Sequence, residues 1–217
     1  MSTIYLLIIM PFFGIIYSKG IDFMRICVYG AASPTIDQEY KDITEEMGKE
    51  MVKRGHSLVF GGGANGLMGA AARGFLKGNA EIIGIVPGFL NVDGLLFDKC
   101  TELICTETMR ERKKILEDSS DAFIVTPGGV GTFDEFFEII TLKQLGRHNK
   151  PIAIYNINGY FDELQKLMEK SLDEKMVAEK SLQLYKMTDD IDCIISYLEN
   201  YNEEAYNISE TKYIGSK

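Results

Sequence analysis

From Arg25 onward, short apolar runs alternate with longer amphipathic segments, and this alternation constrains the fold more strongly than any other feature. The apolar runs are typical of β-strands and lie at residues 25–30, 57–63, 81–87, 101–106, 121–129 and 150–157, with a weaker candidate at 182–189. The segments between them have helical spacing and lie at residues 37–55, 66–79, 108–119, 132–146, 160–175 and 190–206. Continuous rather than alternating apolar strands indicate a sheet that is buried on both faces. The sequence therefore predicts an α/β protein, with a doubly wound, mostly parallel sheet in a three-layer sandwich.

The first 23 residues differ from the rest of the chain. Residues 1–18 carry no charge, and the first charged residue is Lys19, so the basic start of a signal peptide is missing. A membrane span would be interrupted by Pro11 and Gly14. We expect residues 1–23 to be an apolar extension outside the fold, with a membrane anchor or an ordered addition as alternatives. No repeat or linker divides the remainder, so we expect a single domain at 24–200 and a tail at 201–217.

The net charge limits the kind of ligand. The formal charge is −9, which argues against a general nucleic-acid surface because such a surface needs a basic face. A small anion is still allowed, since backbone N–H groups at a helix start can bind it. The four cysteines form no CxxC pair and have no metal-ligand spacing to His56 or His148. We therefore expect no metal, and reduced, mostly buried thiols in a cytoplasmic protein.

Three glycine-rich turns follow predicted strands, at residues 29–35, 60–69 and 126–132. In a parallel sheet the loops after the strands form the ligand crevice, so these turns are expected to meet at one edge. Glycine lets backbone N–H groups approach a ligand, and the following helix adds its positive end. The alternative for each turn is a purely structural role in tight packing. Three such turns together predict a phosphate-bearing small ligand, although neither a dinucleotide fingerprint nor a P-loop lysine is present.

Glu135 lies just after the third glycine turn, and two interpretations are open. Thr132 and Glu135 have the T-x-x-E spacing of a capping box, which would give Glu135 a structural role at the helix start. The helical spacing of Phe133, Phe136, Phe137 and Ile140 predicts that this stripe faces the core and that Glu135 does not.

In the functional interpretation, a carboxylate next to a phosphate site lies one sugar away from the phosphate. It would stabilise the oxocarbenium-like transition state of sugar–base cleavage and activate a water. Basic partners are available at residues 110 and 112–114 on the preceding helix, whose alternative role is a solvated charged face.

At this point the sequence resembles a known family. The segment "PGGVGTFDE" at 127–135 resembles the PGGxGTxxE motif of the LOG (lonely guy) family of cytokinin riboside 5′-monophosphate phosphoribohydrolases, long labelled possible lysine decarboxylases. The segments "GGGANGLMG" at 61–69 and "MRERK" at 109–113 resemble two further family segments, and the likeness covers about residues 25–197. The resemblance implies a Rossmann-like fold, a homodimer, no cofactor, and hydrolysis of a nucleoside 5′-monophosphate to base and ribose 5-phosphate.

The resemblance also implies roles for individual residues. Arg112 and Glu135 match the catalytic pair of the family. The expected substrate-binding residues are Gly128, Gly129, Gly131 and Thr132 in the phosphate turn, Met109, Lys113 and Thr141 near the nucleotide, and Gly62 and Gly63 in the second glycine loop. 

Departures from the family leave the base open. The first loop reads Gly30-Ala31-Ala32-Ser33 where the family often has G-S-S, and Arg110 stands where histidine is frequent. Both AMP and an N6-prenylated AMP such as isopentenyl-AMP remain candidate substrates. A non-catalytic nucleotide or cofactor carrier on the same fold is the alternative function. The decarboxylase label gains no support from the sequence, because a pyridoxal enzyme needs a Schiff-base lysine and none lies in the three glycine turns; Lys113 and Lys143 are the lysines left open.

Overall fold

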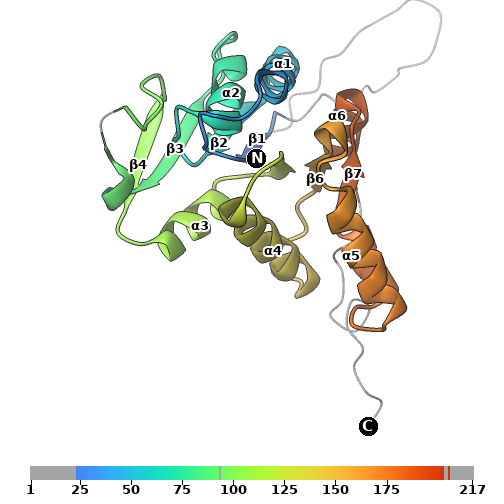
Figure 1. Cartoon of the computed structure of the whole chain (residues 1–217). Coiled ribbons are helices and arrows are strands. Elements are labelled where there is room, and N and C mark those ends of the chain that lie inside the picture. Colours follow the sequence, from blue (N-terminus) through green and yellow to red (C-terminus); the bar gives the residue numbers. More distant parts are fainter. Residues whose placement is uncertain (1–22, 93, 203–204, 206–217) are drawn as a thin grey trace, which may run out of the picture.

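The computed structural model describes residues 23–92, 94–202 and 205, and its strands form one seven-stranded parallel sheet (Figure 1). The strands are β1 (Arg25–Tyr29), β2 (Ser57–Phe60), β3 (Ile82–Pro87), β4 (Glu102–Thr106), β5 (Ala122–Val125), β6 (Ile152–Tyr155) and β7 (Lys186–Thr188). Their order across the sheet is β4-β3-β2-β1-β5-β6-β7. Each neighbouring pair is parallel. The predicted parallel sheet is confirmed, including its weak seventh strand.

Helices cover both faces of the sheet. One face packs against α1 (Gln38–Lys53), α2 (Gly66–Phe75) and α6 (Ile191–Glu199). The other packs against α3 (Met109–Asp118), α4 (Val130–Gln144) and α5 (Asp162–Asp173). Three short 3₁₀ helices, η1 (Gly88–Leu90), η2 (Ile157–Gly159) and η3 (Glu179–Gln183), lie in the connections. The three-layer sandwich is confirmed, and Figure 1 shows α1 and α2 above the sheet and α3 and α4 below it.

The central and edge strands of the sheet differ in burial. Every residue of β3, β5 and β6 is buried, as continuous apolar sequence predicts for strands that are covered on both faces. The two edge strands differ, because β4 is mostly exposed and β7 is only partly buried. Helices therefore cover the middle of the sheet more completely than its edges.

The order of the strands creates a switch point at β1. The chain runs outward from β1 to β2, β3 and β4, and then crosses to β5 on the other side of β1. The loops after β1 and β5 therefore leave in opposite directions, which opens a crevice at their carboxyl ends. The first and third glycine-rich turns follow these two strands.

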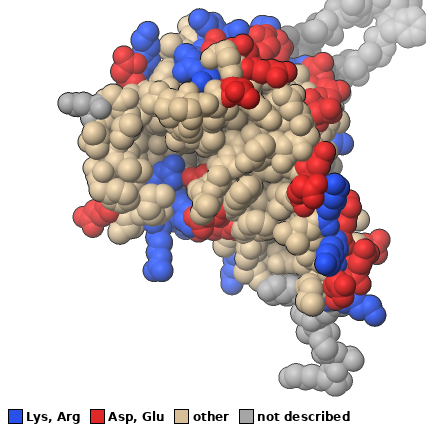
Figure 2. All heavy atoms as spheres, viewed as in Figure 1, with Lys and Arg blue, Asp and Glu red and all other residues tan. Residues whose placement is uncertain are grey.

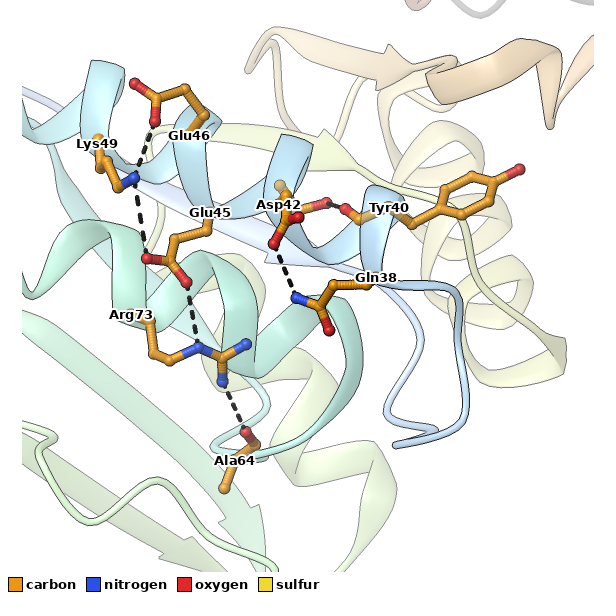
Figure 3. A network of polar contacts seen from close by, with 9 residues as sticks. Gln38, Tyr40, Asp42, Glu45, Glu46, Lys49, Ala64 and Arg73 are labelled. Carbon is orange, nitrogen blue, oxygen red and sulfur yellow. Dashed lines mark hydrogen bonds and ion pairs between the residues drawn. The ribbon is translucent and has the colours of Figure 1, made fainter.

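Helices α1 and α2 approach closely and hold the loop after β2. A Cβ on Gly48 would lie 2.6 Å from the carbonyl oxygen of Ala71, so only glycine allows this packing. Arg73 of α2 joins the two helices to the loop, because its Nε lies 3.3 Å from Glu45 and its Nη1 donates to the Ala64 carbonyl at 3.3 Å (Figure 3). Arg73 thus holds the second glycine-rich turn against α1 and α2.

Several expectations concern the ends of the chain and the cysteines. The expected extension at 1–23 and tail at 201–217 lie almost wholly outside the described residues. Among residues 23–92, 94–202 and 205, no helix has the length and apolar character needed to cross a membrane. All four cysteines are free thiols, but only Cys27 is buried and Cys105 is exposed, so the expectation of mostly buried thiols was wrong.

Candidate active site

The third glycine-rich turn joins β5 to α4 and leaves N–H groups available at the helix start. Helix α4 begins at Val130, with Gly129 as its N-cap and no side chain capping it. Its first intrahelical bond runs from the Phe133 N–H to the Gly129 carbonyl at 3.0 Å. Within the described residues, the N–H groups of Val130, Gly131 and Thr132 have no partner. A helix start of this kind binds anions, because the free N–H groups add to the positive end of the helix.

Arg112 and Glu135 form a buried ion pair beside this helix start. Nη1 of Arg112 lies 2.8 Å from Oε1 of Glu135, and the two residues are 6% and 8% exposed. Nε of Arg112 also donates to the carbonyl of Ile85 in β3 at 3.0 Å. The arginine therefore holds the carboxylate from one side and is itself fixed by the sheet.

Burial changes the proton affinity of Glu135. Removal from water raises the pKa of the Glu135 carboxyl above 4.5, while the charge and hydrogen bond of Arg112 act in the opposite direction. Only Oε1 contacts Arg112; no donor to Oε2 is found among the described residues. One carboxylate oxygen is thus available to a water or a ligand in the cavity.

Gly61 makes room for the arginine. A Cβ at position 61 would lie 2.1 Å from Nη2 of Arg112, well inside van der Waals contact. Gly61 belongs to the second glycine-rich turn, so the contact links this turn to the ion pair. The family motif had pointed instead to Gly62 and Gly63.

The ion pair opens into a cavity of about 400 Å³. Its lining residues are Gly30, Ala31, Ala32, Ser33, Met68, Leu90, Met109, Arg112, Gly129, Gly131, Thr132, Asp134 and Glu135. All three glycine-rich turns therefore contribute to the cavity, together with η1, α3 and α4. Figure 2 shows that the face in view is hollowed, and that basic and acidic side chains lie next to one another between the upper and lower layers.

The structure brings most of the predicted site residues together. Arg112, Glu135, Met109, Gly129, Gly131 and Thr132 line the cavity. Gly62, Gly63, Gly128, Lys113 and Thr141 do not. Gly128 belongs to the turn but lines a second cavity. Thr141 is exposed farther along α4.

Neither lysine considered for pyridoxal chemistry lines the cavity. Nζ of Lys113 lies 3.0 Å from Asp134 and also pairs with Glu138. Lys143 is buried, with its Nζ 4.6 Å from the centre of the Tyr201 ring. Within the described part of the chain, no group of three or more His, Cys, Asp or Glu side chains is arranged to hold a metal ion.

The predicted capping box at Thr132 and Glu135 was wrong. The helix begins three residues earlier than this motif requires, with Gly129 rather than Thr132 as its N-cap, so Glu135 lies in the second turn and contacts Arg112. The same motif does occur at the start of α3, where Thr108 Oγ1 accepts the Glu111 N–H at 3.1 Å. It orients α3, which carries Arg112.

The predicted core stripe of α4 was partly wrong as well. Phe136 and Ile140 are buried, but Phe137 is 40% exposed and Phe133 is only partly buried. The buried face instead includes Thr132 and Glu135. Hydrophobicity alone could not place a buried acid, because its burial depends on the arginine of another helix.

Other cavity residues were not predicted. Met68 and Leu90 line the cavity, as does Asp134. Met68 lies within the second glycine-rich turn but was not singled out there, and no motif marks Leu90.

The fold and this geometry define an α/β protein with a ligand site at the switch point of its sheet. A family model described as "Possible lysine decarboxylase" matches residues 68–198. A cytokinin riboside 5′-monophosphate phosphoribohydrolase of Arabidopsis thaliana is 34% identical over 190 residues, which is 88% of this chain and 89% of the relative. A second Arabidopsis protein with this activity in its name is 34% identical over 179 residues, 82% of this chain and 84% of that relative. The chain therefore belongs to the LOG family.

A solved structure shares the fold. The molybdenum cofactor carrier protein of Chlamydomonas reinhardtii aligns with a TM-score of 0.62 at 24% identity, covering 80% of this chain and 94% of that chain. At this identity the likeness shows the fold alone, and the same fold serves different functions.

Proposed function

We propose that this chain hydrolyses the N-glycosidic bond of a nucleoside 5′-monophosphate and releases the free base and ribose 5-phosphate. The observation that carries the proposal is the buried Arg112–Glu135 pair in the cavity that also contains the start of α4. A helix start binds a phosphate, and a nearby carboxylate suits the anomeric carbon of the sugar that carries this phosphate. Membership of the LOG family supports the same reaction.

Different residues bind the phosphate, stabilise the developing charge and position the carboxylate. The N–H groups of Val130, Gly131 and Thr132 hold the 5′-phosphate, which fixes the ribose beside Glu135. As the bond between C1′ and the base lengthens, positive charge develops on the sugar ring, and the Glu135 carboxylate stabilises it. A water oxygen bonds to C1′ and Glu135 accepts the water proton. The bonding electron pair leaves with the base, which takes up a proton from solvent, and Glu135 returns its proton to solvent. Arg112 positions the carboxylate.

The base side of the cavity is apolar. Met68, Leu90 and Met109 line it, and Leu90 and Met109 are partly open to solvent. Such a surface suits a purine ring and also an apolar N6 substituent. We therefore propose AMP or an N6-modified AMP such as isopentenyl-AMP as substrate; the second would place the protein in cytokinin biosynthesis.

The test is product release from AMP and from isopentenyl-AMP, with free base and ribose 5-phosphate both quantified. We expect equal amounts of the two products. The ratio of kcat/KM between the substrates decides whether the N6 group is recognised. Nucleotide binding without release of either product would contradict the proposal and favour the carrier alternative.

We further propose that the protein acts as a cytoplasmic homodimer whose folded unit is residues 24–200. The family resemblance supports the dimer, and exposed apolar side chains such as Phe89, Leu95 and Leu103 offer surface for it near the β4 edge. Light scattering at micromolar concentration tests it, and a monomer mass would contradict it.

A further inference from the structure

Tyr160 lies outside the glycine motif but contacts it directly. It follows β6, and its hydroxyl donates a hydrogen bond to the Gly128 carbonyl at 2.7 Å. We infer that Tyr160 is a positioning residue for the phosphate-binding turn, because it keeps a carbonyl oxygen of the turn away from the bound anion. The inference deepens the proposed function and rests on it for the identity of the anion.

Three successive carbonyl groups of the turn are occupied. The Pro127 carbonyl accepts the Ala31 N–H at 3.0 Å, the Gly128 carbonyl accepts the Tyr160 hydroxyl, and the Gly129 carbonyl accepts the Phe133 N–H. An anion site needs N–H groups toward the ligand and carbonyl oxygens away from it. Two of the three donors are backbone groups, so Tyr160 is the one anchor of this set that a side-chain substitution can remove.

Because the peptide is planar, the direction of the Gly128 carbonyl also determines the direction of the Gly129 N–H. In a trans peptide the C=O and the following N–H point in opposite directions. Because the Gly128 carbonyl points to Tyr160, the Gly129 N–H points the other way. Tyr160 lines a second cavity of about 380 Å³ behind the turn, and Gly129 borders both this cavity and the substrate cavity. The Gly129 N–H is thereby directed to the substrate side.

The peptide between Gly128 and Gly129 needs such an anchor. Neither residue has a Cβ, so rotation of this peptide meets less steric resistance than it would between residues with side chains. The rotated peptide would present the Gly128 oxygen to the phosphate and repel it. The Tyr160 hydroxyl stabilises the orientation that attracts the phosphate.

Tyr160 is itself held in place before any ligand binds. Its ring makes edge-to-face contacts with Tyr40 and Phe161, with centroids 6.5 Å and 5.0 Å apart. The Asn156 side chain fixes the turn around it, accepting the Phe161 N–H at 2.7 Å and donating to Asp162 at 2.8 Å. Because the Tyr160 hydroxyl is already in position, little conformational entropy is lost at this residue when the anion binds.

The test compares Tyr160→Phe with Tyr40→Phe. Both remove one hydroxyl from the same cavity and keep the ring, but the Tyr40 hydroxyl makes no hydrogen bond to the turn among the described residues. For Tyr160→Phe, loss of one hydrogen bond should raise the Kd of inorganic phosphate and the KM of AMP about tenfold, with a smaller change in kcat. Tyr40→Phe should leave both constants unchanged.

Adenosine, which lacks the phosphate, separates positioning from general damage. Its Kd, measured by calorimetry, should be the same for Tyr160→Phe and the wild type. Equal weakening of adenosine and AMP, or unchanged phosphate affinity in Tyr160→Phe, would overturn the inference. If the wild type binds AMP without hydrolysing it, the proposed reaction fails, while the phosphate affinities still decide the role of Tyr160.

Discussion

At the scale of single residues, Gly61 determines where Arg112 can lie. The guanidinium is fixed between Ile85 and Glu135, so it cannot move away from a new side chain without losing a partner. Replacing Gly61 by alanine places a Cβ 2.1 Å from Nη2. We expect Gly61→Ala to fold and to lose about a hundredfold in kcat, because small misplacements of catalytic groups cost rates of this order. 

The measurement is kcat on AMP together with thermal unfolding. Gly88→Ala is the matched control, since a Cβ there would meet only the Thr106 carbonyl at an ordinary 3.7 Å. Wild-type kcat in Gly61→Ala would show that the position of Arg112 is not important.

The pKa of Glu135 determines where kcat/KM falls on the acid side of the pH profile. Burial raises its pKa above 4.5, and the reaction needs the carboxylate form. We therefore expect kcat/KM to fall with decreasing pH at a pKa above that of an ordinary glutamate. The sign for stability is opposite: the folded state holds the proton more tightly, so ionisation of Glu135 lowers the free energy of unfolding as the pH rises through this pKa. An acid limb at or below 4.5 would contradict the burial argument.

At the scale of elements, the first residue of α4 could not be predicted from the sequence. The hydrophobic pattern and the glycine turn predicted the helix and its place after β5. The first residue was misplaced because Val130 and Gly131 form a first turn that no side chain caps. The turn that precedes them is held by contacts of its Pro127 and Gly128 carbonyls with Ala31 and Tyr160, which are distant in sequence.

A second element-scale feature is His148, which joins α4 to β6. Its Nε2 donates to the Ile139 carbonyl at 2.9 Å, and its Nδ1 accepts the Lys150 N–H at 3.2 Å, so the ring is neutral. Burial lowers the pKa of His148 from 6.5 to about 4. Below pH 6.5 the unfolded chain therefore binds a proton that the folded chain does not, and the free energy of unfolding falls by about 2 kcal/mol between pH 7 and pH 5.

His148→Gln isolates this contribution, since glutamine offers a donor and an acceptor but does not titrate. Chemical unfolding at pH 7 and pH 5 should show a smaller difference for the variant than for the wild type. An identical difference in both proteins would assign the acid sensitivity to other groups.

At the scale of the whole molecule, the architecture was largely predictable. Continuous apolar strands alternating with helices allow few arrangements, and β1 through β7 were each anticipated near their observed positions. The family motif likewise predicted Arg112 and Glu135, which the structure joins at 2.8 Å. Contacts between segments distant in sequence, such as Gly61 with Arg112, carry no local pattern and required the three-dimensional structure.

The proposed folded unit gives a further prediction at this scale. A chain that begins at Met24 retains β1 complete and keeps the His56 Nδ1 contact to the Met24 N–H. We expect it to be soluble, with the same melting temperature and kcat/KM as the full chain. Insolubility or loss of activity would show that residues 1–23 belong to the functional molecule.

The most direct test of the proposed reaction compares the wild type with Glu135→Gln, using AMP and isopentenyl-AMP. Glu138→Gln is the matched control, because it removes a charge from the same helix outside the cavity. We expect the wild type and the control to release base and ribose 5-phosphate, and Glu135→Gln to bind AMP by calorimetry with turnover reduced at least about a hundredfold. Equal turnover in Glu135→Gln, or no turnover in a wild type that binds AMP, would contradict the assignment of Glu135 as the catalytic carboxylate.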